Sequence, residues 1–334
     1  MTVLLVSDPR FADHDMGPWH PERPARLNAA LAGVDDAHLG ADLVHVAPTP
    51  AAMSAITAVH DPGLVALLES IDEIGGGAID GDTSMNDASW DAARLAAGAG
   101  LTAVENLDAG AADAAFCIVR PPGHHATPVR SMGFCLLNNA AVAARALADR
   151  GERVLIVDYD AHHGNGTQDA FYDDPRVLFV SFHQWPLYPG TGALAERGRG
   201  DGIGTTINVP MPAGATGEHY RRAWDDVVAA PVARFDPTWL IVSAGFDGHQ
   251  ADPITELGLT SGDVADLTIE VLATVPAGRR IVFLEGGYDL TALQLCTHAV
   301  TSALAGETVH PERPSAGGPG AEAVTAAAQM HALD

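Results

Sequence analysis

Residues 154–167 read VLIVDYDAHHGNGT. A run of apolar, mostly β-branched residues ends in DYDAHH (158–163), and the chain then breaks at Gly164. A buried strand should not end in two carboxylates and two imidazoles unless something compensates their charge and their loss of water. The stretch therefore predicts a buried strand that delivers polar side chains to a site.

Seven other short apolar runs with strand character recur along the chain. They are 2–8, 43–46, 114–120, 176–183, 205–210, 238–245 and 280–287. Several lack polar–apolar alternation, as expected for strands covered on both faces. The Ala-rich, helix-compatible segments between them include 88–108, 138–150, 217–235 and 261–277. This alternation predicts an α/β domain whose single sheet, with helices on both sides, has about eight mostly parallel strands.

The chain has 334 residues, of which 47% are apolar, enough for one large domain with a buried core. We expect that domain to cover 1–305. A Gly- and Pro-rich linker over 306–320 should follow. The tail over 321–334, with a last helix at about 321–332, should pack on or near the same domain.

The chain is acidic: 18 Lys and Arg face 43 Asp and Glu, a formal charge of −25. Nucleic acid is therefore excluded as a partner, because phosphate binding needs a basic face. The charge is typical of a solvated acidic surface, and attraction of cationic substrates is the alternative. No apolar run reaches the ~20 residues of a membrane span, and no signal peptide is evident, so we expect a cytoplasmic protein without a membrane partner. Three scattered cysteines indicate reduced thiols.

Polar residues cluster just after five of the predicted strands. They are PPGHH (121–125), His162 with His163, His183, Asp247 and Tyr288. In an open parallel sheet, ligands bind beyond the carboxyl ends of the strands. Five strand ends that deliver His, Asp and Tyr to one edge predict one convergent site.

Asp160 and His162 are two residues apart, so their side chains point the same way along an extended segment. With Asp247 they would give a divalent ion three ligands and leave positions open for water and substrate, as at catalytic zinc sites. Such an ion would compensate the buried carboxylates, and Asp158 is a candidate anchor for a ligand. A polar surface turn is the alternative for the Asp160–His162 pair taken alone.

Two Asp ligands and one His neutralise a dication almost fully, so water bound there is less acidic than at an all-His site and needs a general base. His124 and His125 offer two imidazoles behind a stiff Pro-Pro-Gly entry. Tyr288 follows Gly286 and Gly287 and can donate its hydroxyl to a developing oxyanion. A pair of turn or core histidines is the alternative for His124 and His125.

Taken together, these motifs resemble the histone deacetylase superfamily, nearer its second class than its first. Bacterial deacetylase-like amidohydrolases and acetylpolyamine amidohydrolases are similar too. The matching segments are GPWHPERPARL (17–27), RPPGHHA (120–126), GFCLLNNAAVAA (133–144), VDYDAHHGNGTQDAFY (157–172), VSFHQWPLYPGTG (180–192), INVPMPAG (207–214), SAGFDGHQADP (243–253) and LEGGYDL (284–290).

The resemblance implies an arginase/deacetylase-like three-layer α/β/α fold with an eight-stranded, mostly parallel sheet. It implies one zinc ion per chain, held by Asp160, His162 and Asp247. It also implies one or two structural potassium ions. The first would take oxygens from Asp158, Asp160, His162, Ser181 and Phe182, and the second backbone oxygens near Phe171, Asp174 and Val177.

The resemblance also implies roles for the remaining polar residues. His125 would be the general base and acid, and His124, paired with Asp158, a positively charged electrostatic partner. Tyr288 would polarise the amide carbonyl. Asn165 stands where first-class enzymes carry an Asp beside the base. An uncharged partner should raise the pKa of His125 less than a carboxylate would, which leaves the imidazole neutral at lower pH.

The substrate tunnel is implied in the same way. The positions lining a narrow acyl-lysine tunnel are matched by Gly133, Phe134 and Tyr188. Asp82 is the candidate for the rim residue that anchors the substrate, and a solvated loop Asp is the alternative. Polyamine-selective relatives carry an acidic gatekeeper where this chain has Ile254, which favours acyl-lysine, although Glu256 and Glu22 remain candidates for the rim.

We therefore expect a zinc-dependent amidohydrolase that hydrolyses N-acyl amides of lysine side chains or related alkylamines. An acetylpolyamine amidohydrolase and a longer-chain lysine deacylase are the nearest alternatives. A dinuclear manganese ureohydrolase shares the fold but needs a further Asp where this chain has Gly164. A catalytically silent acyl-lysine-binding protein is the non-enzyme alternative. It could dispense with the base or the tyrosine, whereas this chain keeps both.

Overall fold

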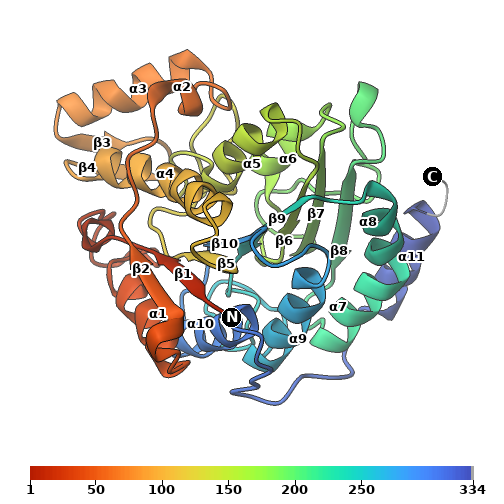
Figure 1. The fold of residues 1–334 in the computed structure, drawn as a ribbon. Helices are drawn as coiled ribbons and strands as arrows, with labels where there is room; N and C mark the ends of the chain where they lie inside the picture. Colours follow the sequence, from red (N-terminus) through yellow and green to blue (C-terminus); the bar gives the residue numbers. More distant parts are fainter. Residues whose placement is uncertain (332–334) are drawn as a thin grey trace.

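Eight strands form one sheet at the centre of the computed structural model, which describes residues 1–331 (Figure 1). In spatial order they are β2 (Leu43–Val46), β1 (Val3–Val6), β5 (Ala114–Cys117), β10 (Arg280–Leu284), β9 (Trp239–Ala244), β6 (Val154–Asp158), β7 (Val177–Gln184) and β8 (Thr206–Met211). Every neighbouring pair is parallel. The predicted α/β fold is confirmed, and each strand overlaps one of the predicted apolar runs.

Helices cover both faces of this sheet (Figure 1). One face packs against α4 (Ser89–Asp108), α5 (Asn139–Asp149) and α6 (Asn165–Phe171). The other is covered by α1 (Ala25–Asp36), α7 (Gly217–Ala223), α9 (Ser261–Leu272) and α10 (Leu290–Leu304). All residues of β5, β6 and β9 are buried, which explains why their sequences are apolar without alternation.

The remaining elements lie around this three-layer core. They are α2 (Met53–Ile56), α3 (Pro62–Glu73), α8 (Ala229–Phe235), α11 (Ala321–His331) and the short strands β3 (Gly76–Ala78) and β4 (Ser84–Asn86). A π-helical turn over Trp224–Val228 joins α7 to α8, so the predicted helix over 217–235 is nearly continuous. Within residues 1–331, no helix combines the length and the apolar character needed to cross a membrane.

The expected tail lies against the edge of the sheet. Helix α11 packs on β8 and α7, and residues 332–334 of the expected tail fall outside the described part of the chain. The segment before it has no regular secondary structure but is bonded to the core. The carboxylate of Glu312 accepts the backbone N–H of Ser261 at 3.0 Å and faces His249 Nε2 at 2.7 Å.

Two central strands end earlier than the apolar runs predict, because the chain leaves the sheet to build a site. β5 ends at Cys117, three residues before 120, and the chain then enters the two prolines, which lack the N–H that a strand ladder requires. β10 ends at Leu284, and the N–H of Gly286 donates to the carboxylate of Asp160 at 2.8 Å.

Candidate active site

The segments that follow four neighbouring strands meet at one edge of the sheet. Strands β5, β10, β9 and β6 lie side by side in that order. The segments after them carry, respectively, His124 with His125, Tyr288, Asp247, and Asp160 with His162. All six side chains are buried, so the structure brings these predicted site residues together inside the protein.

Asp160, His162 and Asp247 form a compact set of metal-ligating groups, with ligand atoms within 4.8 Å of one another. The imidazole Nδ1 of His162 lies 3.0 Å from Asp247 Oδ2 and 3.2 Å from Asp160 Oδ1. A tetrahedral zinc ion bound at ~2.1 Å holds its ligands roughly 3.4 Å apart, so donor types and spacing fit zinc. Backbone N–H groups of Ala161 and Gly286 hold the other carboxylate oxygens, each at 2.8 Å.

The pKa values of this cluster are shifted because its two buried carboxylates leave an excess of negative charge. Burial, together with the charge of Asp160, raises the pKa of Asp247 to about 7. Burial lowers the pKa of His162, but Asp247 and Asp160 outweigh it and raise that pKa to about 10. Metal binding requires ionised carboxylates and a neutral imidazole. A dication bound at this point would balance the two carboxylates. His162 would then stay neutral instead of taking up a proton.

His124 lies beside this cluster as a positively charged group. Its Nδ1 is 2.9 Å from Asp158 Oδ2. Burial lowers the pKa of His124, but the carboxylates of Asp160 and Asp158 raise it well above its usual value. Asp158 also accepts the backbone N–H of Asp160 at 3.1 Å, so one carboxylate connects the imidazolium with the metal-ligating segment.

His125 has the opposite character. Its Nδ1 lies 2.7 Å from the side-chain oxygen of Asn165. That oxygen only accepts, so Nδ1 carries the hydrogen and Nε2 is the basic nitrogen. Burial and the charge of His124 lower the pKa of His125 well below its usual value. The two imidazole centroids are 4.0 Å apart, and a charged and a neutral imidazole so close together favour acid–base chemistry.

A cavity of about 240 Å³ opens above these groups. It is lined by Asp82, His125, Gly133, Phe134, His162, Leu187, Tyr188, Ile254 and Tyr288. The four residues predicted to contact substrate are all among them, and Leu187, which the sequence did not single out, directly precedes Tyr188. A Cβ at Gly133 would lie 2.5 Å from His125 Cδ2, so only glycine leaves room for the imidazole. Apolar walls above a polar base suit an alkyl chain that ends in a polar group.

The mouth of the cavity differs in part from the expectation. Asp82 is exposed in the β3–β4 turn and lines the cavity. Trp19 is 95% exposed, and the next residue, His20, places its ring centroid 4.5 Å from that of Phe134. Glu256 is exposed but lies outside the cavity lining. The placement of Glu22 at the rim is wrong, because this side chain is completely buried.

Glu22 belongs to an internal charge network that the sequence did not reveal. Its carboxylate lies between Arg26 and Arg120, both completely buried. The Arg26 guanidinium also donates to the carbonyl oxygen of Gly287 and lies 5.0 Å from the ring centroid of Tyr288. The network thus supports the segment that carries Tyr288. Arg120, a charged residue at the end of an apolar run, was the available signal, but its pairing with Glu22 is not visible in the sequence.

Some of the residues expected to hold potassium are also buried. Asp158 and Ser181 are register partners on β6 and β7, and both are completely buried. Ser181 Oγ lies 3.0 Å from His183 Nδ1. The residues expected at the second potassium site span the turn from α6 into β7, where the N–H of Asp174 donates to the carbonyl of Phe171.

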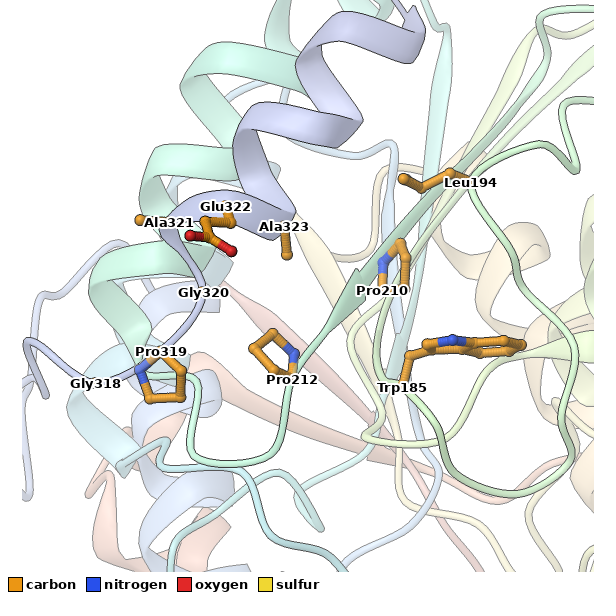
Figure 2. A pocket seen from close by; sticks show the side chains of 10 residues that line it. All are labelled: Trp185, Leu194, Pro210, Pro212, Gly318, Pro319, Gly320, Ala321, Glu322 and Ala323. Atoms are coloured by element: carbon orange, nitrogen blue, oxygen red, sulfur yellow. The ribbon is translucent and has the colours of Figure 1, made fainter.

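A larger cavity, of about 620 Å³, lies away from these groups (Figure 2). Its walls are the indole of Trp185, the side chain of Leu194, two prolines at the end of β8 and the first turn of α11. Glu322 is its only ionisable lining residue within 1–331. The groups needed for hydrolysis therefore gather at the smaller cavity.

Sequence comparison agrees with this assembly. The profile of the Histone deacetylase domain matches residues 20–304, most of the chain. The protein belongs to the histone deacetylase family, whose members are deacetylases and amidohydrolases, as the sequence motifs predicted.

The chain matches individual relatives over most of its own length and most of theirs. The chain is 39% identical over 313 residues to a probable deacetylase of Archaeoglobus fulgidus, with 92% of this chain and 87% of that protein covered. It is 34% identical over 307 residues to the histone deacetylase-like amidohydrolase of Pseudomonas aeruginosa, with 90% and 79% covered. The crystal structure of the HDA15 HD domain superposes with a TM-score of 0.91 at 34% identity, over 99% of this chain and 94% of that one.

Proposed function

We propose that the protein is a zinc-dependent amidohydrolase that removes acyl groups from lysine side chains or related alkylamines. One observation carries the proposal: the cluster of Asp160, His162 and Asp247 lies beside the paired imidazoles of His124 and His125 at the base of a largely apolar cavity. A zinc ion held by that cluster would supply Lewis-acid polarisation of the amide carbonyl and acidify bound water.

The protein's own groups then have distinct tasks in the proposed reaction. His125 Nε2 takes a proton from the attacking water and later gives it to the leaving amine. His124, held by Asp158, contributes a fixed positive charge beside the reacting carbonyl. Tyr288 donates its hydroxyl hydrogen to the developing oxyanion. Burial raises the pKa of Tyr288 well above its usual value, which keeps that hydrogen in place.

Acylated lysine in a polypeptide is the substrate class we propose. The side chains of Phe134, Tyr188 and Ile254 would pack the methylenes of the substrate chain. Ile254 lines the cavity where an acidic gatekeeper would favour a polyamine, which supports lysine. Asp82 at the mouth is proposed to accept backbone N–H groups of the peptide, and the exposed Trp19 offers a contact for a neighbouring side chain.

Structural potassium is part of the proposal. One ion would lie beside the zinc cluster, at the oxygens contributed by Asp158, Asp160, His162, Ser181 and Phe182, and a second near Phe171, Asp174 and Val177. The complete burial of the polar side chains of Asp158 and Ser181 on adjacent strands supports the first site. Elemental analysis of protein dialysed against a sodium buffer tests it.

The experiment compares kcat/KM of the zinc-loaded protein for acetyl-lysine peptides, longer acyl-lysine peptides and acetylpolyamines. The released carboxylic acid is measured for every substrate, because acetylpolyamines carry free amines of their own that an amine-reactive dye would label. The Asp160→Asn variant, without its metal, is the inactive control. We expect the highest kcat/KM for an acyl-lysine peptide. Protein with one zinc per chain that hydrolyses none of these amides would refute the proposal, and two metals per chain would favour a ureohydrolase.

A further inference from the structure

Glu285, in the LEGGY segment, is completely buried and has no task in the proposed reaction. Its Oε2 accepts the backbone N–H of Gly123 at 2.7 Å and that of His124 at 3.2 Å. One carboxylate oxygen therefore holds two consecutive amides of the segment that carries both site imidazoles.

The backbone of Glu285 is itself fixed on two sides. Its N–H donates to the carbonyl oxygen of Ala244 at 3.0 Å, at the end of the neighbouring strand β9. Its carbonyl oxygen accepts a hydrogen bond from the buried guanidinium of Arg26. Glu285 is thus held directly after the central strand β10, with its backbone bonded to the end of β9 and to Arg26.

The carbonyl oxygens of the segment held by Glu285 are bonded elsewhere, that of Pro121 to Asn139 and that of His124 to the N–H groups of Gly166 and Thr167, but its backbone N–H groups depend on Glu285. Pro121 and Pro122 have no N–H, so Gly123 and His124 contribute all the backbone donors of residues 121–124. Both donors bond to Glu285. Without this acceptor, two buried N–H groups next to the imidazoles would be unpaired, which would destabilise the segment.

The second carboxylate oxygen of Glu285, Oε1, indicates that core stability alone does not explain why a carboxylate stands at this position. Glu285 Oε1 is buried and has no hydrogen-bond partner within residues 1–331. The side chain lies in a cluster with His124 and Cys135, whose ligand-type atoms are within 4.8 Å of one another. A buried carboxylate that leaves one oxygen unpaired is costly. A well-packed apolar side chain would avoid this cost but could not accept the two backbone N–H groups. Accepting those hydrogen bonds is therefore what the carboxylate contributes.

We propose that Glu285 is a positioning residue for amide hydrolysis, which fixes the His124–His125 pair by accepting the Gly123 and His124 backbone N–H groups. This inference rests on the proposed function for its kinetic part only. A displacement of about 1 Å at a catalytic group can cost ~10²-fold in rate, so loosening the segment should lower kcat while the substrate tunnel stays intact.

Three variants test the inference. Glu285→Met keeps the side-chain volume but has no oxygen acceptor, and Glu285→Gln keeps an acceptor. The matched control is Asp263→Leu, because Asp263 is another buried carboxylate that accepts backbone N–H groups, from Thr260 at 2.9 Å and Ser315 at 3.0 Å, outside the cavity lining. For each protein we would measure kcat, KM, zinc content, melting temperature, and amide hydrogen exchange over 121–126 in the metal-free form.

In Glu285→Met we expect faster exchange over 121–126 and a kcat lowered ~10–100-fold, with KM and zinc content within twofold of the parent. Glu285→Gln should restore slow exchange and most of kcat. Asp263→Leu should lower the melting temperature without changing either quantity. Unchanged exchange or unchanged kcat in Glu285→Met, or an equal loss of kcat in Asp263→Leu, would overturn the proposal.

Two further measurements keep the test decisive. If Glu285→Met does not fold, Glu285→Asp takes its place, because it withdraws the acceptor by one methylene. Glu285→Asp should show smaller changes of the same kind in exchange and kcat. Exchange and kcat equal to those of the parent would overturn the proposal. The exchange measurement does not depend on hydrolysis. If the parent protein hydrolyses no acyl amide, the proposed function fails, while slow exchange at Gly123 and His124 still supports the positioning contact and fast exchange overturns it.

Discussion

Replacing Asn165 with Asp should move the acid limb of the pH–rate profile to higher pH. The Asn165 oxygen lies 2.7 Å from His125 Nδ1 in a buried site, so the substitution puts a carboxylate where an uncharged acceptor now stands. Two unit charges 4 Å apart interact by ~4 kcal/mol at an effective dielectric constant of about 20. Structural relaxation reduces this, and an opposite charge at such a distance shifts a pKa by roughly 1–3 units.

The sign follows from the role proposed for His125. A general base is active when neutral, and activity is lost as pH falls through its pKa. In the parent protein that pKa lies well below its usual value, so activity should persist into the acid range. A carboxylate partner stabilises the protonated imidazole and raises the pKa. The acid limb should therefore rise by ~1–3 pH units, with less change on the alkaline side.

The assay is kcat/KM for an acetyl-lysine peptide across the acid and neutral range, with zinc content measured at each pH. Asn106→Asp is the control, because it makes the same chemical change away from the site. Asn106 lies on α4, where its side chain donates to the carbonyl oxygen of Thr102 at 2.8 Å. The control profile should match the parent. An acid limb that stays in place in Asn165→Asp, or moves to lower pH, would refute the assignment of that titration to His125.

Four further variants probe other parts of the site. Tyr288→Phe should keep its zinc and lose ~10²–10³ in kcat, and unchanged turnover would remove this hydroxyl from the mechanism. Asp160→Asn should lose the metal, so full zinc occupancy by elemental analysis would contradict the ligand assignment. Glu22→Gln leaves two buried guanidinium groups undercompensated and should lower the free energy of unfolding in urea by ~3–5 kcal/mol, whereas parent-like stability would show that the network contributes little. Trp19→Ala should lower kcat/KM for peptides but not for small acetylated amines, and an equal effect on both would exclude a contact with the peptide.

The eight strands of the main sheet were predictable from the sequence because each is a local pattern. The run over 154–157 is apolar on both faces since helices cover both sides of the sheet, and that property is visible in the sequence itself. The order of the strands was not predictable. β10 and β9 lie between β5 and β6, although they come last in the chain, and periodicity contains no information about which strands become neighbours. The β3–β4 hairpin was missed because its Gly-rich sequence is typical of a loop.

The candidate site was predictable where residues of unusual polarity follow apolar runs, as Asp160 and Asp247 do. Glu22 was misplaced because its partner Arg120 is 98 residues away in the sequence, and a charge pair of this kind appears in no local pattern. Glu285 was missed for a related reason. Its bonds run to backbone amides, which carry no residue-specific signal.

The strand order has a consequence for biosynthesis. Because β9 and β10 fill the middle of the sheet, a nascent chain that stops before them has two half-sheets with nothing to join them. Asp247 and Tyr288 follow the other candidate site residues in the chain, so the candidate metal cluster cannot be complete before residue 247 has been synthesised. A truncation at residue 238 would therefore remove two strands from the middle of the sheet rather than from its edge.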